Sequence, residues 1–110
     1  MSGHPSAIAC NVNAFTPEER VRHSAATAAL KASVCSIEEA AIGYRWHFDQ
    51  TLSTSDILQW IVDEQRCCPF LDFVVHLACD SGPRWIQMSG RDGVKTFLAA
   101  EFADLLKRNG

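Results

Sequence analysis

The segment Glu64–Phe70, with the sequence Glu-Gln-Arg-Cys-Cys-Pro-Phe, contains the residues best suited to chemistry. Two adjacent cysteines, Cys67 and Cys68, stand directly before Pro69, and the carboxylate of Glu64 precedes them by about one helical turn. Thiolate sulfur binds soft or borderline ions, here zinc, copper(I), mercury(II) or arsenite. A carboxylate at this spacing can supply a further ligand or accept a thiol proton. The segment therefore predicts a site for a soft metal or metalloid ion.

Pro69 determines how the two sulfur atoms lie. Adjacent side chains on a straight helix diverge by about 100° and cannot easily share one ligand. Proline lacks an N–H group and pushes the residue before it, Cys68, out of the helical region. We therefore expect a helix to end at Cys67 and the chain to turn there, so that both sulfur atoms approach one point.

Glu64 lies within the apolar stripe of that helix, together with Ile57 and Ile61. An unpaired buried carboxylate is costly, so we expect a proton, a metal or an arginine to neutralise it. The candidate arginines are Arg45, Arg84 and Arg91. Glu101 has a similar place on the last predicted helix, where its long side chain can reach solvent.

The position of the cysteine pair argues against a highly reactive thiol. The negative end of the helix dipole and the Glu64 carboxylate both favour the protonated form of a thiol at this helix end. Metal binding needs no low pKa, since the ion itself displaces the proton. The pattern thus favours an accessory or sensor domain over an enzyme. Two alternatives stay open: a structural homodimeric domain with a packed Cys-Cys-Pro corner, and a thiol-dependent redox or transferase enzyme with Glu64 as proton acceptor.

The remaining cysteines are less informative. Five cysteines, an odd number, argue against a framework of disulfides, so Cys10, Cys35 and Cys79 are interpreted as small buried apolar residues. The ion site nevertheless needs further ligands, and the candidates are Cys35, Cys79, His47 and His76. Strand alternation predicts that Cys79 faces inward, so the predicted metal ligands are Glu64, Cys67, Cys68 and Cys79.

The histidines are assigned mostly to the surface. His47 and His76 are expected to share the opposite sheet face, away from the cysteine pair. His4 and His23 are not assigned to the site.

Hydrophobic periodicity and turn residues predict the order α-β-α-β-β-α. Thr16, Pro17 and Glu19 form a capping box at the first helix. The expected elements are a helix over 17–32, a strand over 41–48, a helix over 56–67, strands over 70–79 and 84–89 joined as a hairpin, and a helix over 94–106. The fold class is α+β, with a small, mainly antiparallel sheet of about three strands packed with helices.

Residues 1–14 are expected to be an irregular N-terminal segment, and 15–110 a single α+β domain. The aromatic side of the first strand and the alanine-rich side of the first helix would both gain from a partner. The alanine-rich side consists of Val21, Ala25, Ala28, Ala29 and Ala32. We therefore predict a homodimer.

Composition narrows the class of protein. The chain has 110 residues, of which 47% are hydrophobic and 21% charged, as in ordinary globular proteins. A net charge of −3 gives no reason to expect nucleic acid or an acidic membrane as partner. The stretch Met1–Ser6 has neither a basic start nor an apolar run, so we expect no secretory signal and a cytoplasmic location.

The motif Glu64-x-x-Cys67-Cys68-Pro69-Phe70-Leu71, followed by Phe73, resembles a group of small, uncharacterised bacterial proteins. The resemblance extends over roughly residues 15–103 and includes the run Ser89–Leu98, Ser-Gly-Arg-Asp-Gly-Val-Lys-Thr-Phe-Leu. Such proteins accompany heavy-metal-resistance genes, so the resemblance implies a heavy-metal theme. It supplies no catalytic residues.

Overall fold

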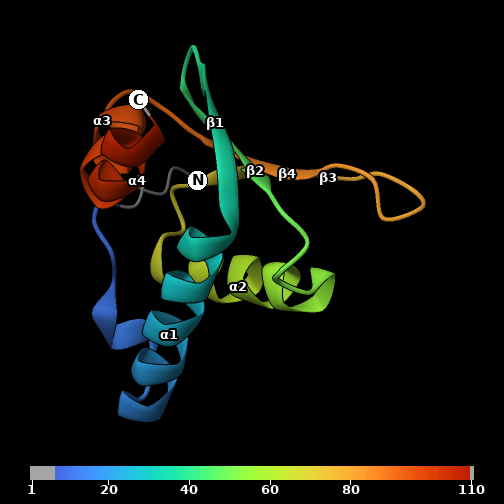
Figure 1. The fold of residues 1–110 in the computed structure, drawn as a ribbon. Helices are drawn as coiled ribbons and strands as arrows, with labels where there is room; N and C mark the ends of the chain where they lie inside the picture. The colour runs from blue at the N-terminus through green and yellow to red at the C-terminus, as the bar shows by residue number, and fades with distance from the viewer. Residues whose placement is uncertain (1–6, 110) are drawn as a thin grey trace, which may run out of the picture.

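The computed structural model describes residues 7–109, so the stretch Met1–Ser6, used above for the secretory signal, lies outside the described residues. Figure 1 shows a sheet with two pairs of helices packed against it. The elements are η1 (Val12–Ala14), α1 (Pro17–Ser33), β1 (Val34–Ala40), β2 (Gly43–Phe48), α2 (Thr54–Cys67), β3 (Asp72–Leu77), β4 (Arg84–Ser89), α3 (Val94–Glu101) and α4 (Ala103–Asn109). The α+β class is therefore confirmed.

The sheet has four antiparallel strands in the order β1-β2-β4-β3. The predicted hairpin is confirmed, with β3 and β4 in register from Asp72 opposite Ser89 to Leu77 opposite Arg84. Gly43 marks a close approach of β2 to β4, because a Cβ atom there would lie 1.9 Å from the carbonyl oxygen of Met88. Only glycine fits this position without a shift of the backbone.

The sheet has one strand more than predicted. The additional strand, β1, lies at the edge and pairs with β2 across a two-residue turn. Its sequence, Val-Cys-Ser-Ile-Glu-Glu-Ala, has no apolar alternation and two glutamates, which are uncommon in strands. This strand is held by backbone hydrogen bonds to β2. Such bonds do not depend on the type of side chain, so the sequence pattern could not predict the strand.

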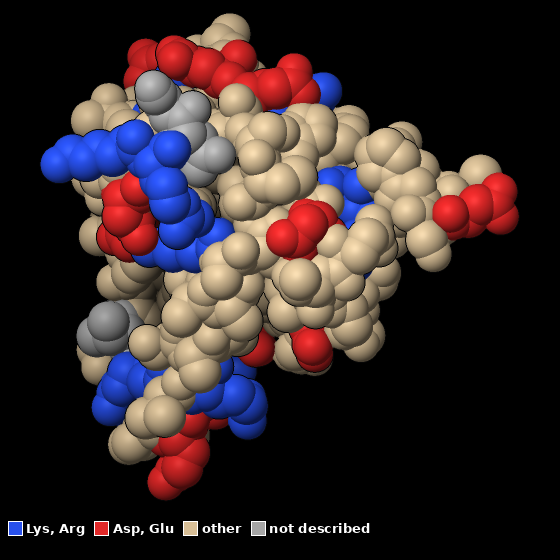
Figure 2. Space-filling model, viewed as in Figure 1, with Lys and Arg blue, Asp and Glu red and all other residues tan. Residues whose placement is uncertain are grey.

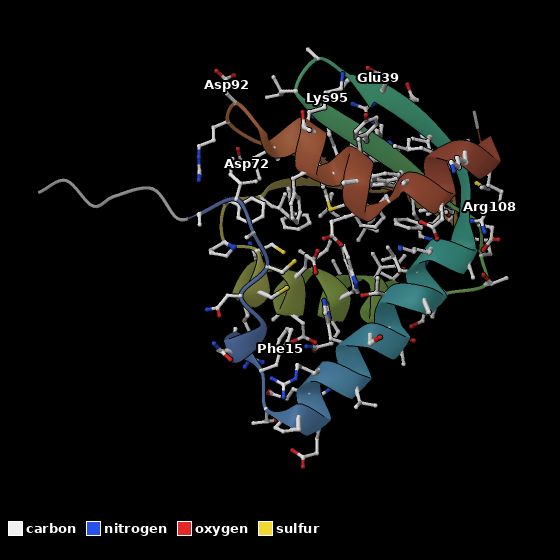
Figure 3. The ribbon with its side chains drawn as sticks, turned by 90° about the vertical axis from the view of Figure 1, so that its left-hand side faces the viewer. Phe15, Glu39, Asp72, Asp92, Lys95 and Arg108 are labelled. Atoms are coloured by element: carbon white, nitrogen blue, oxygen red, sulfur yellow. The ribbon has the colours of Figure 1, made fainter. Side chains whose placement is uncertain are left out.

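One face of the sheet forms the core. The alternate residues Tyr44, Trp46 and Phe48 of β2 are buried, as are Ile86 and Met88 of β4. Their neighbours Arg45, His47, Trp85 and Gln87 are only half-buried and form the opposite, open face. Figure 3 shows the side chains of the core filling the space between the sheet, α3, α4 and α2. The predicted aromatic stripe is thus confirmed, except that Ile42 is exposed in the turn.

Two further expectations were wrong. Of the predicted inward set on β3, Phe73 is half-buried, whereas Val75, Leu77 and Cys79 are exposed. The reason is visible in Figure 1, where the β3–β4 hairpin projects beyond the helices. The last helix is also not continuous, because Phe102 leaves the helical conformation and separates α3 from α4.

The first helix begins as predicted. Thr16 accepts a hydrogen bond from the backbone N–H of Glu19, and the Glu19 carboxylate accepts one from the N–H of Thr16. The face of α1 opposite the alanine-rich side packs against the rest of the protein. Its residues include His23, Thr27 and Leu30. Val21, on the alanine-rich side, is 73% exposed.

Among the helices within residues 7–109, none combines the length and the apolar character needed to cross a bilayer. On the face drawn in Figure 2, acidic and basic side chains lie close to one another, and a large part of the surface is uncharged.

Candidate metal centre

The end of α2 brings two sulfur atoms together, as the sequence predicts. Cys68 has left the helical region, with φ −128° and ψ 67°, although its N–H still donates a 2.7 Å hydrogen bond to the carbonyl oxygen of Glu64. The Sγ atoms of Cys67 and Cys68 lie 3.5 Å apart, and both side chains are buried. The conformational restriction by Pro69 explains this turn.

A third thiol joins the pair from the N-terminal segment. The Sγ atom of Cys10 lies 3.0 Å from that of Cys68, and the three Sγ atoms all lie within 4.8 Å of one another. The backbone N–H of Asn11 donates a 2.7 Å hydrogen bond to the carbonyl oxygen of Cys67, which is free because the helix ends there. Cys10 is exposed, so its interpretation as a buried apolar residue was wrong.

Arg66 holds the N-terminal segment against α2. Its guanidinium donates hydrogen bonds to the carbonyl oxygen of Ala14 at 2.7 Å and to the Glu19 carboxylate at 2.9 Å. The same group lies 4.9 Å from the ring centre of Phe15. These contacts join the end of α2 to the start of α1 and to the residues that follow Cys10 in the chain.

Glu64 is 9% exposed and its partner is His23 of α1, not one of the three expected arginines. The His23 Nε2 atom lies 2.8 Å from the Glu64 Oε1 atom, which also lies 3.5 Å from the Sγ atom of Cys67. His23 packs between the rings of Phe15 and Trp60, at 5.1 and 6.0 Å between ring centres. Its Nδ1 atom is buried without a hydrogen-bond partner, so the tautomer with the proton on Nε2 fits best.

Two of the three expected arginines have other partners. Arg45 binds Gln87 on the open face of the sheet, and Arg84 binds Thr54 and the carbonyl oxygen of Asp49. The positions of both arginines are set by the pairing of β2 with β4. The sequence alone does not reveal this pairing.

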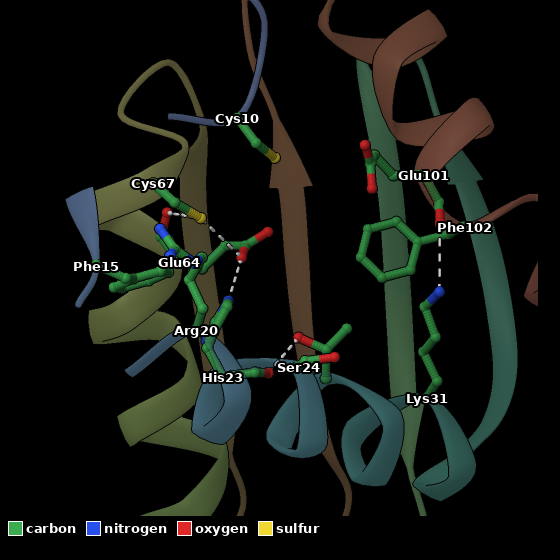
Figure 4. A pocket seen from close by; sticks show the side chains of 11 residues that line it. Cys10, Phe15, Arg20, His23, Ser24, Lys31, Glu64, Cys67, Glu101 and Phe102 are labelled. Atoms are coloured by element: carbon green, nitrogen blue, oxygen red, sulfur yellow. Dashed lines mark hydrogen bonds and ion pairs between the residues drawn. The ribbon is translucent and has the colours of Figure 1, made fainter. Parts of the chain in front are cut away.

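A cavity of about 360 Å³ adjoins the thiols. Cys10, His23, Glu64 and Cys67 line one side of it, and Glu101 and Phe102 line the other, as the close-up in Figure 4 shows. Burial raises the pKa of Glu101, and the negative charges of Cys10 and Glu64 add to this effect. Glu101 is also exposed, as expected, so it lines the open side of this cavity.

The three thiols differ in acidity. Hydrogen bonds from Cys67 and Cys68 lower the pKa of Cys10, because two S–H donors stabilise its thiolate. The pKa values of Cys67 and Cys68 are raised, first because they are the donors to Cys10 and further by burial and the charge of Glu64. The direction agrees with the predicted resistance of the pair to ionisation, but the first cause is the hydrogen bond to Cys10 and not the helix dipole. Cys10 is the thiol that loses a proton most readily.

The other predicted ligands lie elsewhere. Cys79 is exposed after β3, and Cys35 is exposed on β1, where its thiol donates to the carbonyl oxygen of His47 at 3.4 Å. His47 and His76 share the open sheet face, as expected, because both stand opposite Trp85 in the strand register. The structure thus brings Glu64, Cys67 and Cys68 together, but not Cys79.

Sequence reasoning missed Cys10 and His23. A helical pattern over His23, Thr27 and Leu30 could have indicated that His23 faces inward. The place of Cys10 depends on a backbone hydrogen bond between residues far apart in the chain, for which the sequence carries no signal.

The chain matches no protein-family model. Searches among curated proteins and among solved structures also found no match. The interpretation of the site therefore rests on its own geometry.

Proposed function

We propose that this protein binds a soft metal or metalloid ion through the thiolates of Cys10, Cys67 and Cys68. The observation that carries the proposal is the mutual approach of their three Sγ atoms to within 4.8 Å. Two of these side chains are buried and the third is exposed, so the cluster has an inner wall and an accessible side. An ion could therefore enter without unfolding of the chain.

The donor chemistry supports the same proposal. Three sulfur ligands favour soft ions over magnesium or calcium, which bind oxygen. The rings of Phe15 and Phe102 line the cavity beside the cluster, together with charged side chains of α1, α2 and α3. Glu64 and His23 lie beside the sulfur atoms and are bonded to each other, which suits them to orient Cys67.

Native mass spectrometry of the reduced chain tests this function. The protein is offered zinc(II), copper(I), mercury(II) and arsenite in the presence of competing free thiol. We expect one equivalent of at least one ion to be retained, and to be lost from Cys10→Ser and from the double variant Cys67→Ser/Cys68→Ser. The matched control is Cys35→Ser/Cys79→Ser, which removes two exposed thiols outside the cluster. Equal uptake by the cluster variants would favour a packed structural corner instead.

A thiol-dependent enzyme is the second candidate, favoured by one observation. The lowered pKa of Cys10 and its place beside a cavity are properties of a nucleophile, with the His23–Glu64 pair nearby to transfer a proton. From the sequence, the enzyme alternative assigned the nucleophilic thiol to Cys67 or Cys68. Their pKa values are raised, so Cys10 is the better candidate. This candidate requires Cys10 to react as a thiolate near neutral pH.

A further inference from the structure

The charges around the thiol cluster distinguish one class of ion from another, given that the cluster binds an ion as proposed above. Glu64 lies 3.5 Å from the Cys67 sulfur, and Glu101 lines the same cavity. The basic groups on that cavity are Arg20, His23 and Lys31, all from α1. His23 is bonded to Glu64, and Lys31 donates to Asp104 and to the carbonyl oxygen of Glu101.

The charge of the bound complex depends on the ion. A divalent cation held by three thiolates gives a complex of net charge −1, half-enclosed beside the carboxylate of Glu64. Burying such a charge next to a second negative group is costly. A trivalent metalloid arrives instead as a neutral hydroxide, M(OH)₃. It exchanges three M–O bonds for three M–S bonds. Cys67 and Cys68 each give a thiol proton to a departing hydroxide, and the third hydroxide takes a proton from solvent, because Cys10 is the thiolate. The balance is M(OH)₃ + 2 RSH + RS⁻ + H⁺ → M(SR)₃ + 3 H₂O, with no change of oxidation state and a neutral product.

The number of available ligands also favours a trivalent metalloid over a divalent cation. Each group of candidate ligand residues found within residues 7–109 has three members: Cys10, Cys67 and Cys68 in one, and His23, Glu64 and Cys67 in the other. Structural zinc sites need four protein ligands. A trivalent metalloid needs three, because a lone pair occupies the fourth direction.

The spacing of the sulfur atoms also fits three ligands in a pyramid. With a metal–sulfur bond of about 2.3 Å, sulfur atoms at tetrahedral angles lie about 3.8 Å apart, and at right angles about 3.3 Å apart. Two of the three separations, 3.0 Å from Cys10 to Cys68 and 3.5 Å from Cys67 to Cys68, lie on either side of the second value, and the third is within 4.8 Å. We infer that the ion of this site is a trivalent metalloid of the arsenite or antimonite type, captured as its neutral hydroxide by Cys10, Cys67 and Cys68.

The cavity beside the cluster provides the space that this exchange requires. Its volume of about 360 Å³ is that of about twelve water molecules in the liquid. This space can hold the incoming hydroxide and the three water molecules that the exchange releases. The lone pair of the bound ion can point into the same cavity.

Competition between sodium arsenite and zinc(II) tests the inference. The full chain with Cys35→Ser/Cys79→Ser is used, so that only the cluster thiols remain, and it is reduced before both ions are added together in equal amounts. We expect one arsenic atom per chain, no zinc, and the loss of all three titratable thiols. We also expect each of Cys10→Ala, Cys67→Ala and Cys68→Ala to weaken arsenite binding at least a hundredfold.

Each other outcome has a distinct meaning. Retention of zinc(II) with no uptake of arsenite would overturn the metalloid inference and leave the proposed function standing. No uptake of arsenite here, together with no retention of zinc(II), copper(I) or mercury(II) in the native mass spectrometry above, would overturn both. Undiminished arsenite binding by Cys10→Ala would show a two-sulfur site and contradict capture by three thiols. A circular dichroism melt of each variant identifies any that fails to fold, and the competition on the unvaried cluster decides the inference without them.

Discussion

The backbone N–H of Asn11 donates a 2.7 Å hydrogen bond to the carbonyl oxygen of Cys67, and this bond joins the N-terminal segment to the cysteine pair. Replacement of Asn11 by proline removes the donor, so Cys10 should lose its place beside Cys68. We expect Asn11→Pro to weaken ion binding about 10- to 100-fold, the range typical of residues that orient a ligand. Isothermal titration calorimetry with arsenite and mercury(II) measures the change.

The control for this variant is Asn11→Ala, which keeps the backbone donor and removes only the side-chain oxygen that caps η1. Its affinity should stay close to that of the wild type. Equal weakening by alanine and proline would assign the effect to the cap and not to the bond with Cys67.

Cys10 should react as a thiolate below the usual pH range of thiols. Because its pKa is lowered by hydrogen bonds from Cys67 and Cys68, its thiolate fraction should change little between pH 8 and pH 6. The thiolate fraction of an ordinary cysteine, with a pKa of about 8.5, falls about 80-fold over that interval. Alkylation with iodoacetamide, followed by peptide mass spectrometry, compares Cys10 with the exposed Cys79. A parallel fall at Cys10 would contradict the hydrogen-bonded cluster and remove the enzyme candidate.

The ion pair of Glu19 and Arg66 should make the start of α1 sensitive to acid. Hydrogen bonds from Arg66, first, and from Thr16 lower the pKa of Glu19 to about 2, below its ordinary value of about 4.3. A lowered pKa stabilises the fold above about pH 4.3, and this contribution is lost as the pH falls towards 2. Glu19→Gln should therefore lower the Tm at pH 7 and approach the wild type at pH 3. Glu18→Gln, in the same helical turn, is the control, and a gap in Tm that does not close in acid would refute this assignment.

Formation of a homodimer stays a prediction. The aromatic stripe of β2 is buried within the chain, so it gives no reason for a partner. The alanine-rich side of α1 remains available, with Val21 exposed. Sedimentation velocity should give a mass near twice that of the chain, and Ala28→Arg, on the alanine-rich side, should shift it to the monomer. A monomer at all concentrations of the wild type would make the prediction wrong.

Local signals in the sequence predicted most of the elements. Thr16, Pro17 and Glu19 define the start of α1, and Pro69 defines the end of α2. The aromatic alternation of β2 identified the core face of the sheet. The edge strand β1 was missed because its side chains do not alternate, and its pairing depends on β2.

Only the part of the candidate site that lies within one local segment could be predicted from the sequence. Glu64, Cys67 and Cys68 belong to one helix end, so local geometry relates them. Cys10 and His23 come from other segments, and tertiary packing alone brings them near. Cys79 was placed inward by strand alternation, but alternation does not say whether a helix covers that part of the strand. The β3–β4 hairpin projects past the helices, and Cys79 is exposed as a result.

X-ray absorption spectroscopy of the ion-loaded protein tests the central claim most directly, because it counts the sulfur atoms bound to the ion. The reduced Cys35→Ser/Cys79→Ser chain is loaded with one equivalent of arsenite and, in a second sample, of mercury(II). We expect three sulfur neighbours around the retained ion, falling to two in Cys10→Ser. A spectrum of this chain with two sulfur atoms or fewer, completed by oxygen or nitrogen, would contradict a site built from Cys10, Cys67 and Cys68.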